Sequence, residues 1–110
     1  MTGQGYQAGF DAIVVGGGPA GLMAAGACAA RGKRVALLEK NRQLGPKLRI
    51  TGKGRCNVTN DCTWQEAAAA AVRGARFLRG AMSRFSPADV MAFFEGLGVP
   101  LKVERGRRVF

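Results

Sequence analysis

The clearest hydrophobic pattern lies near the N-terminus, where two short apolar runs flank a helix-length segment of small residues. Phe10–Val15 is apolar except for Asp11, and Val35–Leu38 is entirely apolar. Such runs are typical of parallel strands that are buried on both faces. Between them, Pro19–Arg31 consists mostly of alanine and glycine, and Gly32 is well placed to cap a helix that ends there. The pattern predicts a strand–helix–strand unit of the α/β class.

A glycine motif joins the first predicted strand to the predicted helix. Gly16, Gly18 and Gly21 have the G-x-G-x-x-G spacing in the strand-to-helix context that this motif requires. Gly16 permits a sharp turn, Gly18 leaves room for a pyrophosphate, and Gly21 lets the helix approach the strand. Pro19 suits the first helical position. The amide groups at the start of the helix would then face bound phosphates.

An acidic residue, Glu39, ends the second predicted strand, 23 positions after Gly16. A carboxylate at this place can accept hydrogen bonds from both hydroxyls of an adenosine ribose, and it would repel the 2′-phosphate of NADP. The sequence therefore predicts a dinucleotide site. An ordinary strand–helix–strand unit without a ligand is the alternative.

A second glycine-rich segment, Thr51–Asn60, combines glycines with arginine, asparagine and threonine. Glycine allows backbone to approach a ligand, and the polar side chains supply directional hydrogen bonds. A solvent-exposed loop is the alternative interpretation. Lys47–Thr51, just before it, is predicted to be either extended or helical.

The remainder of the chain is mainly helical in pattern. We expect helices over 65–72 and 75–84 and a third that begins at Pro87, with Ser86 as its capping residue. The third helix carries apolar residues that we expect in the core, namely Val90, Phe93, Phe94 and Leu97. Leu101–Glu104 and Arg107–Phe110, joined by Arg105 and Gly106, predict a β-hairpin.

Length and charge limit the possible functions. At 110 residues the chain is one domain at most, and two parallel strands are few for its fold class, so we expect a longer protein. The net charge is +10, and residues 31–55 hold nine Lys or Arg against Glu39 alone. No aromatic residue interrupts this block, which favours cofactor electrostatics or a solvated face over nucleic-acid binding.

Cysteine and histidine usage argues against a metal site. The chain has no histidine, and Cys28, Cys56 and Cys62 lack the spacing of zinc ligands. We expect no metal. With neither a signal peptide nor an apolar run long enough to span a bilayer, we expect a cytoplasmic protein that does not bind membranes.

Three sequence runs, VVGGGPAGLMAA, LLEKN and LGPKLRITGKGRCNVTN, resemble the N-terminus of a bacterial FAD-dependent oxidoreductase family. Its members are described as aminoacetone oxidase-like or bile-acid 4,6-reductase-like flavoproteins. The resemblance covers 10–110 and implies a Rossmann-like FAD-binding strand–helix–strand unit followed by helices and a β-hairpin. It also implies that 10–110 is the N-terminal part of an incomplete FAD-binding domain without its substrate domain. Residues 1–9, which contain three glycines and no hydrophobic pattern, are expected to be a flexible leader.

The resemblance also implies a set of cofactor-binding residues. Gly16, Gly18, Pro19, Ala20 and Gly21 would hold the pyrophosphate of FAD and Glu39 the ribose, with Lys40 and Lys47 alongside and Gly54, Arg55, Cys56 and Asn57 close to the flavin. Positive charge from Arg55 or Lys53 would favour the reduced cofactor. Pro46 departs from the pattern, because the family usually has a basic residue there.

The expected function is therefore the FAD-binding portion of a flavin-dependent oxidoreductase. NAD(P)H is a candidate electron donor, the expected substrate is a small molecule, and we expect no nucleic-acid partner. The rest of its own chain would be needed to complete the site, and no catalytic acid or base is identified. The alternative is a non-catalytic module that binds the ADP moiety of a nucleotide.

Overall fold

The computed structural model describes residues 9–110, so nearly all of the predicted leader over 1–9 lies outside the described residues. The chain divides into two compact units, the first ending at Ile50 and the second spanning Thr51–Phe110. Each unit is built mainly from contacts within itself, and each is described separately below.

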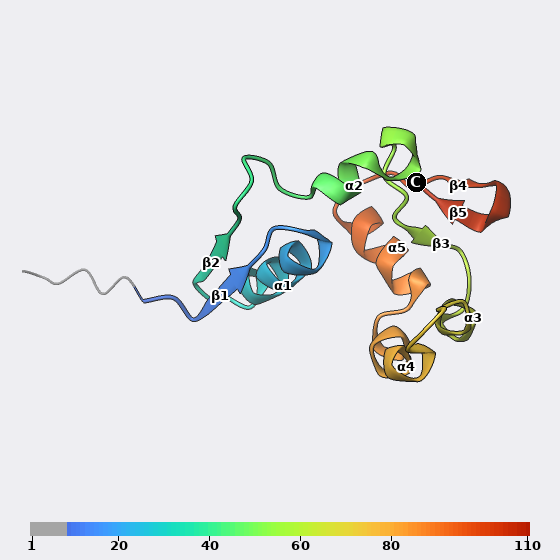
Figure 1. Ribbon diagram of the computed structural model, residues 1–110, viewed down its shortest axis with the longest axis horizontal. Coiled ribbons are helices and arrows are strands. Elements are labelled where there is room, and N and C mark those ends of the chain that lie inside the picture. Colours follow the sequence, from blue (N-terminus) through green and yellow to red (C-terminus); the bar gives the residue numbers. More distant parts are fainter. Residues whose placement is uncertain (1–8) are drawn as a thin grey trace, which may run out of the picture. The chain divides into compact units, whose positions relative to one another are not determined.

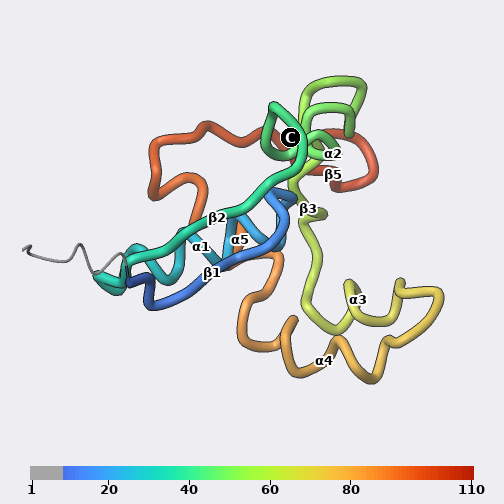
Figure 2. The backbone as a smooth tube through the Cα atoms, turned by 60° about the vertical axis from the view of Figure 1, so that its left-hand side comes forward, coloured from blue at the N-terminus to red at the C-terminus, as the bar shows by residue number. Residues whose placement is uncertain are grey.

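The first unit is a parallel strand–helix–strand arrangement. It contains β1 (Ala12–Val15), α1 (Pro19–Ala30), β2 (Val35–Leu38) and a short helix α2 (Pro46–Ile50). The two strands pair in parallel, and α1 runs along one face of them (Figure 1 and Figure 2). The predicted fold class is confirmed. β2 has the predicted bounds, and β1 starts two residues after Phe10. The segment that was predicted to be either extended or helical, Lys47–Thr51, is helical from Lys47 to Ile50 as part of α2.

Hydrogen bonds fix the end of α1, where the connection between the strands turns into β2. At the end of α1, Gly32 (φ +73°) donates from its amide to the carbonyl of Ala29 at 2.9 Å, and Lys33 donates to that of Cys28 at 3.2 Å. These two bonds form a Schellman motif, for which glycine is favoured because the position needs a positive φ. The chain therefore leaves the helix directly into β2, as the position of Gly32 predicts.

The second unit combines three helices with a small antiparallel sheet. Its elements are η1 (Thr51–Gly54), β3 (Thr59–Asn60), α3 (Trp64–Ala69), α4 (Ala75–Arg84), α5 (Pro87–Gly96), β4 (Val103–Glu104), η2 (Arg105–Arg107) and β5 (Arg108–Val109). The strand order is β3–β5–β4. β4 and β5 form the predicted hairpin. β3 is an addition, because the sequence pattern gave this segment only as a glycine-rich loop.

Two capping boxes set the starts of α3 and α5. The hydroxyl of Thr63 accepts from the amide of Glu66 at 3.1 Å, and the hydroxyl of Ser86 accepts from that of Asp89 at 3.2 Å. In return each carboxylate accepts from the backbone amide of its capping residue. These backbone hydrogen bonds lower the pKa values of both carboxyl groups. α4 has the predicted bounds, whereas α3 ends three residues before the predicted Val72.

Few apolar side chains are enclosed. Of the hydrophobic residues in 9–110, Ala68 and Val109 are the ones that are buried, and Val109 is completely enclosed. The expectation that the apolar face of α5 is core is wrong for Phe93 and Leu97, which are 40% and 66% exposed. Phe93 is sheltered chiefly by edge-to-face contacts with Phe85 and Phe94. The small sheet offers too little surface to cover the helix, so its apolar face stays partly in solvent.

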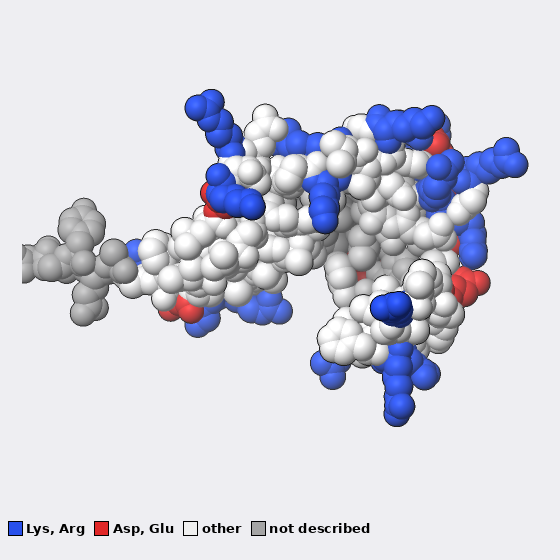
Figure 3. All heavy atoms as spheres, viewed as in Figure 1, with Lys and Arg blue, Asp and Glu red and all other residues white. Residues whose placement is uncertain are grey.

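Basic side chains are prominent on the surface, and Lys and Arg greatly outnumber Asp and Glu on the face drawn in Figure 3. Among the helices of residues 9–110, none combines the length and the apolar character needed to cross a membrane.

Candidate functional site

The glycine turn lies at the carboxyl ends of the paired strands. Gly16 follows directly after β1, and its amide donates to the carbonyl of Leu38, the last residue of β2, at 2.7 Å. Gly16 has a φ of +103°, a conformation that residues with a Cβ atom rarely adopt. The turn therefore opens at the edge of the sheet where open α/β folds bind their ligands.

Gly18 and Gly21 are glycines for different reasons. A Cβ atom at Gly21 would lie 1.8 Å from the carbonyl oxygen of Gly16 and 3.3 Å from Cγ1 of Val14, so α1 packs closely on the turn and on β1. A Cβ atom at Gly18 would meet no atom within 4 Å. The protein does not need glycine at position 18 for its own packing, and the space beside this residue is open to a ligand.

The first turn of α1 offers hydrogen-bond donors. Pro19 occupies the first helical position, where its missing N–H group costs little. Within the described residues, the amides of Ala20 and Gly21 have no protein acceptor, and no acidic side chain occupies this turn. Free amides and the positive end of a helix dipole favour an anion. Together with the space at Gly18, this donor set fits a diphosphate.

Glu39 lies over the glycine turn. Its carboxylate accepts from the amide of Gly17 at 3.4 Å and from the amide and side chain of Asn41, also at 3.4 Å. These are long bonds, so the carboxylate can exchange them for the hydroxyls of a sugar. The structure thus brings Glu39 and the glycine turn together within the first unit.

The loop after β2 folds back onto the same turn, which the sequence pattern did not predict. The amide of Gly45 donates to the carbonyl of Gly17 at 2.8 Å. A Cβ atom at Gly17 would lie 2.4 Å from Cδ2 of Leu44, so this glycine is needed for close packing. The signal in the sequence was Gly17 itself, the middle one of three consecutive glycines, which stands at a position where the G-x-G-x-x-G spacing does not require glycine. Lys40 and Lys47 are exposed, the latter on α2.

The segment Gly52–Cys56 has an unusual backbone. Gly52, Lys53, Gly54 and Cys56 all have positive φ values, between +56° and +87°. For the two residues that are not glycine, this conformation costs about 1–3 kcal/mol each and persists only where the surroundings impose it. Here Thr51 holds the segment, since its carbonyl accepts from the amide of Cys56 at 3.1 Å.

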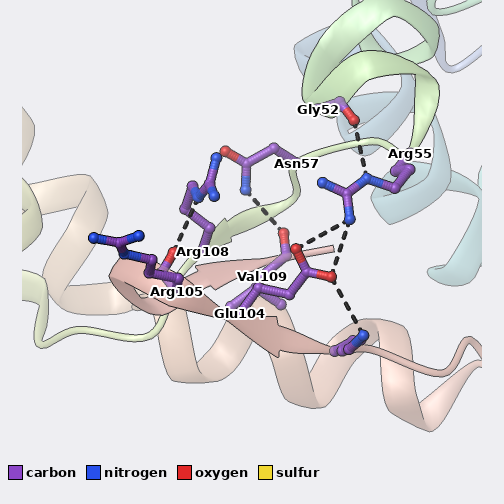
Figure 4. Close-up of polar contacts among 8 residues, drawn as sticks. Gly52, Arg55, Asn57, Glu104, Arg105, Arg108 and Val109 are labelled. Carbon is purple, nitrogen blue, oxygen red and sulfur yellow. Dashed lines mark hydrogen bonds and ion pairs between the residues drawn. The ribbon is translucent and has the colours of Figure 1, made fainter.

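Arg55 is tied to the hairpin. Its Nη1 donates to both carboxylate oxygens of Glu104 at 3.0 Å, and its Nε donates to the carbonyl of Gly52 at 3.3 Å (Figure 4). Its guanidinium also lies 4.1 Å from the ring centroid of Phe110. The hydrogen bond from Arg55 lowers the pKa of Glu104, and a second one from Lys102 adds to this effect. The guanidinium therefore joins the glycine-rich segment to β4 and to the end of β5.

Asn57 makes a second connection to the same strands. Its side-chain Nδ2 donates to the carbonyl of Val109 at 2.9 Å (Figure 4) and also to that of Thr59, at 3.0 Å. Gly52 also contacts the hairpin, because a Cβ atom there would lie 2.6 Å from the ring of Phe110. Sequence reasoning missed Glu104 and Phe110, which stand about 50 residues further on and are brought to the segment only by the sheet.

Comparison with known proteins decides the family. The model of the HI0933-like protein Rossmann domain matches residues 10–110. The chain belongs to this family. Its members are flavin-dependent oxidoreductases that generally bind FAD, so this HI0933-like chain is a Rossmann-type nucleotide-binding domain of a flavoprotein family. The resemblance noted in the sequence is confirmed.

Two curated relatives resemble this HI0933-like chain. A ribosomal RNA dihydrouridine synthase of Escherichia coli (strain K12) is 32% identical over 90 residues, which are 82% of this chain and 22% of the relative. A 3-dehydro-bile acid delta(4,6)-reductase of Clostridium scindens is 33% identical over 95 residues, which are 84% of this chain and 23% of the relative. The chain thus spans less than a quarter of the length of these relatives.

The predicted site residues of the HI0933-like chain fall into two groups. The first unit holds the group expected at the pyrophosphate and ribose, namely Gly16, Gly18, Pro19, Ala20, Gly21 and Glu39, together with Lys40 and Lys47. The second unit holds the group expected near the flavin, namely Gly54, Arg55, Cys56 and Asn57.

Proposed function

We propose that this chain forms the portion of a flavin-dependent oxidoreductase that holds the ADP half of FAD and contributes a segment to its flavin half. The observation that supports this most directly is the open donor end of α1, with Glu39 beside it. Ala20 and Gly21 would donate their free amides to the diphosphate. Glu39 would accept from the ribose hydroxyls, and the exposed Lys40 and Lys47 would add positive charge.

At the flavin end we propose different tasks for two cations. The charge of Arg55 is shared with Glu104, so Arg55 chiefly positions the segment Gly52–Cys56 on the hairpin. Lys53 is exposed and, within the described residues, forms no ion pair, so it is the better source of positive charge beside the cofactor. FAD supplies the redox chemistry when it is bound, and the protein binds and orients it. Gly54, Cys56 and Asn57 would bring their backbone close to the ring system.

For the complete protein we propose a reduction, with NAD(P)H as electron donor. The names of the two relatives point to different substrates. One modifies a ribosomal RNA and the other reduces a bile acid. A small molecule and a nucleobase of RNA are therefore the two candidate substrate classes. We also propose a reducing, cytoplasmic environment, which the unpaired thiols of Cys28, Cys56 and Cys62 support.

Substitution of Gly18 tests the proposed cofactor site. Gly18 is the N-cap of α1, has φ −80° and ψ −175°, and has open space around it. Aspartate and asparagine are both favoured at such a position, so Gly18→Asp and Gly18→Asn should keep or raise stability. The added carboxylate would also repel a diphosphate. We expect FAD affinity to fall at least tenfold for Gly18→Asp, and less for the neutral Gly18→Asn.

The measurement uses the intact protein, its visible absorption spectrum and chromatographic identification of the released nucleotide. A yellow protein that releases FAD, and whose affinity falls on Gly18→Asp at unchanged melting temperature, supports the proposal. Unchanged FAD binding by Gly18→Asp would overturn the assigned site. A colourless protein that releases ADP or a related nucleotide would support the non-catalytic module instead.

A further inference from the structure

A hollow between α3 and α4 shares no residue with the proposed cofactor site. It has a volume of about 340 Å³, which lies within the range of small-ligand sites, and its walls include Trp64, Ala68, Ala69, Arg76 and Arg79. Trp64 is half-buried, and both arginines are exposed. One aromatic residue and two arginines therefore line the same accessible space.

The arginines form part of a longer basic strip. Arg73 precedes α4, Arg76 and Arg79 stand one turn apart on it, and Arg84 ends it; all four are exposed. Within the described residues none of the four has an ion-pair partner. Within α4, the eight positions from Arg76 to Arg84 cover about 12 Å at 1.5 Å per residue. Basic side chains project around this pair of helices in Figure 3.

Glu66, the one acidic residue within 64–85, does not neutralise the positive charge of the arginines. Residues 64–85 contain four arginines and one acidic residue, Glu66, which gives +4 − 1 = +3. The carboxylate of Glu66 is already engaged, because it accepts from the amide of Thr63 at 2.9 Å and from Arg107 at 3.3 Å. The four guanidinium groups are thus left to an external anion.

We propose that the hollow and the basic strip bind an unpaired stretch of nucleic acid, with a base against Trp64 and the phosphates along the arginines. Four unpaired guanidinium groups spread over and just before one helix suit an extended polyanion better than a single phosphate. Aromatic rings that stack bases, combined with arginines that track the backbone, are the means by which proteins bind single strands. The basic block at 31–55 contains no aromatic residue, whereas here the fold places Trp64 beside Arg76 and Arg79.

A lipid surface fits the same charges less well. A helix that lies on a membrane presents its apolar face outward. In α4 that face contains Leu78 and Met82, which are half-buried within the unit, while the arginines face solvent. The exposed Val72 and Phe77 make vesicle binding a necessary arm of the test.

The experiment measures binding of the intact protein to a fluorescein-labelled 12-nucleotide single-stranded RNA of mixed sequence, by fluorescence anisotropy at several salt concentrations. The double variant Arg76→Gln/Arg79→Gln removes two exposed charges. Its control, Lys33→Gln/Arg105→Gln, changes two exposed cations elsewhere and alters the net charge equally. If both arginines contact phosphates, the slope of log K against log salt should fall by about 1.4.

The expected result is a loss of affinity of at least tenfold for Arg76→Gln/Arg79→Gln, with less than threefold for the control. Trp64→Leu should weaken binding roughly 5- to 150-fold and leave the salt slope unchanged, because stacking is not an ionic contact. Single-stranded DNA of the same sequence and duplex RNA are measured beside it. Equal binding of DNA and RNA would show that the surface recognises single strands in general. Preferential binding of RNA would identify RNA as the natural ligand.

Three results would overturn the proposal: no binding of either single strand, equal losses in the hollow and control variants, or binding to phosphatidylserine vesicles without binding to the single strands. Flavin absorption of the same preparations separates this proposal from the cofactor assignment. A yellow protein that ignores single strands refutes the nucleic-acid surface alone. A colourless protein that binds them refutes the cofactor assignment alone.

Discussion

Two glycines within α1 provide a matched pair of substitutions, because one of them touches the glycine turn and the other does not. A Cβ atom at Gly26 would meet no atom within 4 Å. At Gly21 it would lie 1.8 Å from the carbonyl oxygen of Gly16 and 3.3 Å from Val14. Gly21→Ala and Gly26→Ala therefore make the same chemical change in the same helix, and differ in the contact that it creates.

The free energies can be worked from these distances. Alanine is favoured over glycine inside a helix by about 1 kcal/mol, so Gly26→Ala should stabilise the protein by up to that amount. Gly21→Ala has the same gain, but its contact must open from 1.8 Å to at least 3.0 Å. Relieving such overpacking costs about 1–3 kcal/mol. The unfolding free energies of the two variants should therefore differ by about 1–3 kcal/mol.

The same displacement should affect the cofactor. Moving the Gly16 carbonyl or the helix by more than about 1 Å disturbs the donors at the start of α1, and errors of this size are costly in preorganised sites. We expect FAD affinity to fall at least tenfold for Gly21→Ala and to stay unchanged for Gly26→Ala. Urea unfolding followed by circular dichroism and FAD titration of the apoprotein provide the measurements. Equal stabilities together with equal affinities would refute the reasoning.

Three further substitutions test the second unit. Arg55 holds the pKa of Glu104 below its usual 4.5, so the ionised carboxylate stabilises the fold above that pH, and this contribution is lost on acidification. The urea midpoint of the protein should therefore fall between about pH 6 and about pH 3, and Glu104→Gln should make this fall smaller. An equal fall in the variant would contradict the assignment. Ser86→Ala removes the cap of α5 and should cost about 1 kcal/mol in urea unfolding, whereas Ser86→Thr should restore most of it. Val109→Ala deletes two fully buried methyl groups and should cost about 2–3 kcal/mol. Val103→Ala, on an exposed side chain of the neighbouring strand, should cost less than half as much.

The first unit was predictable because its signals are local. Strand, glycine turn, helix and strand follow one another within thirty residues, and each boundary is marked by a residue with a conformational reason, such as Gly16 or Gly32. The hairpin and the cap at Ser86 were predictable for the same reason. Short-range patterns of this kind specify an element without knowledge of its neighbours.

The apolar face of α5 shows where pattern reasoning failed. Spacing indicates which side of a helix is apolar, but it does not say whether another element covers that side. Phe93 and Leu97 have the periodicity of core residues and yet are 40% and 66% exposed. The amount of surface that the small sheet can offer is a property of the assembled unit, and no local pattern contains it.

The sequence by itself determined the strand–helix–strand unit, the family and the residues at the glycine turn, because these depend on neighbours in the chain. Only the tertiary structure joined Arg55 to Glu104 and Phe110, and only it placed Trp64 beside Arg76 and Arg79. The physical reason is the same in both cases. A contact between residues that are far apart in the sequence is decided by how elements pair and pack.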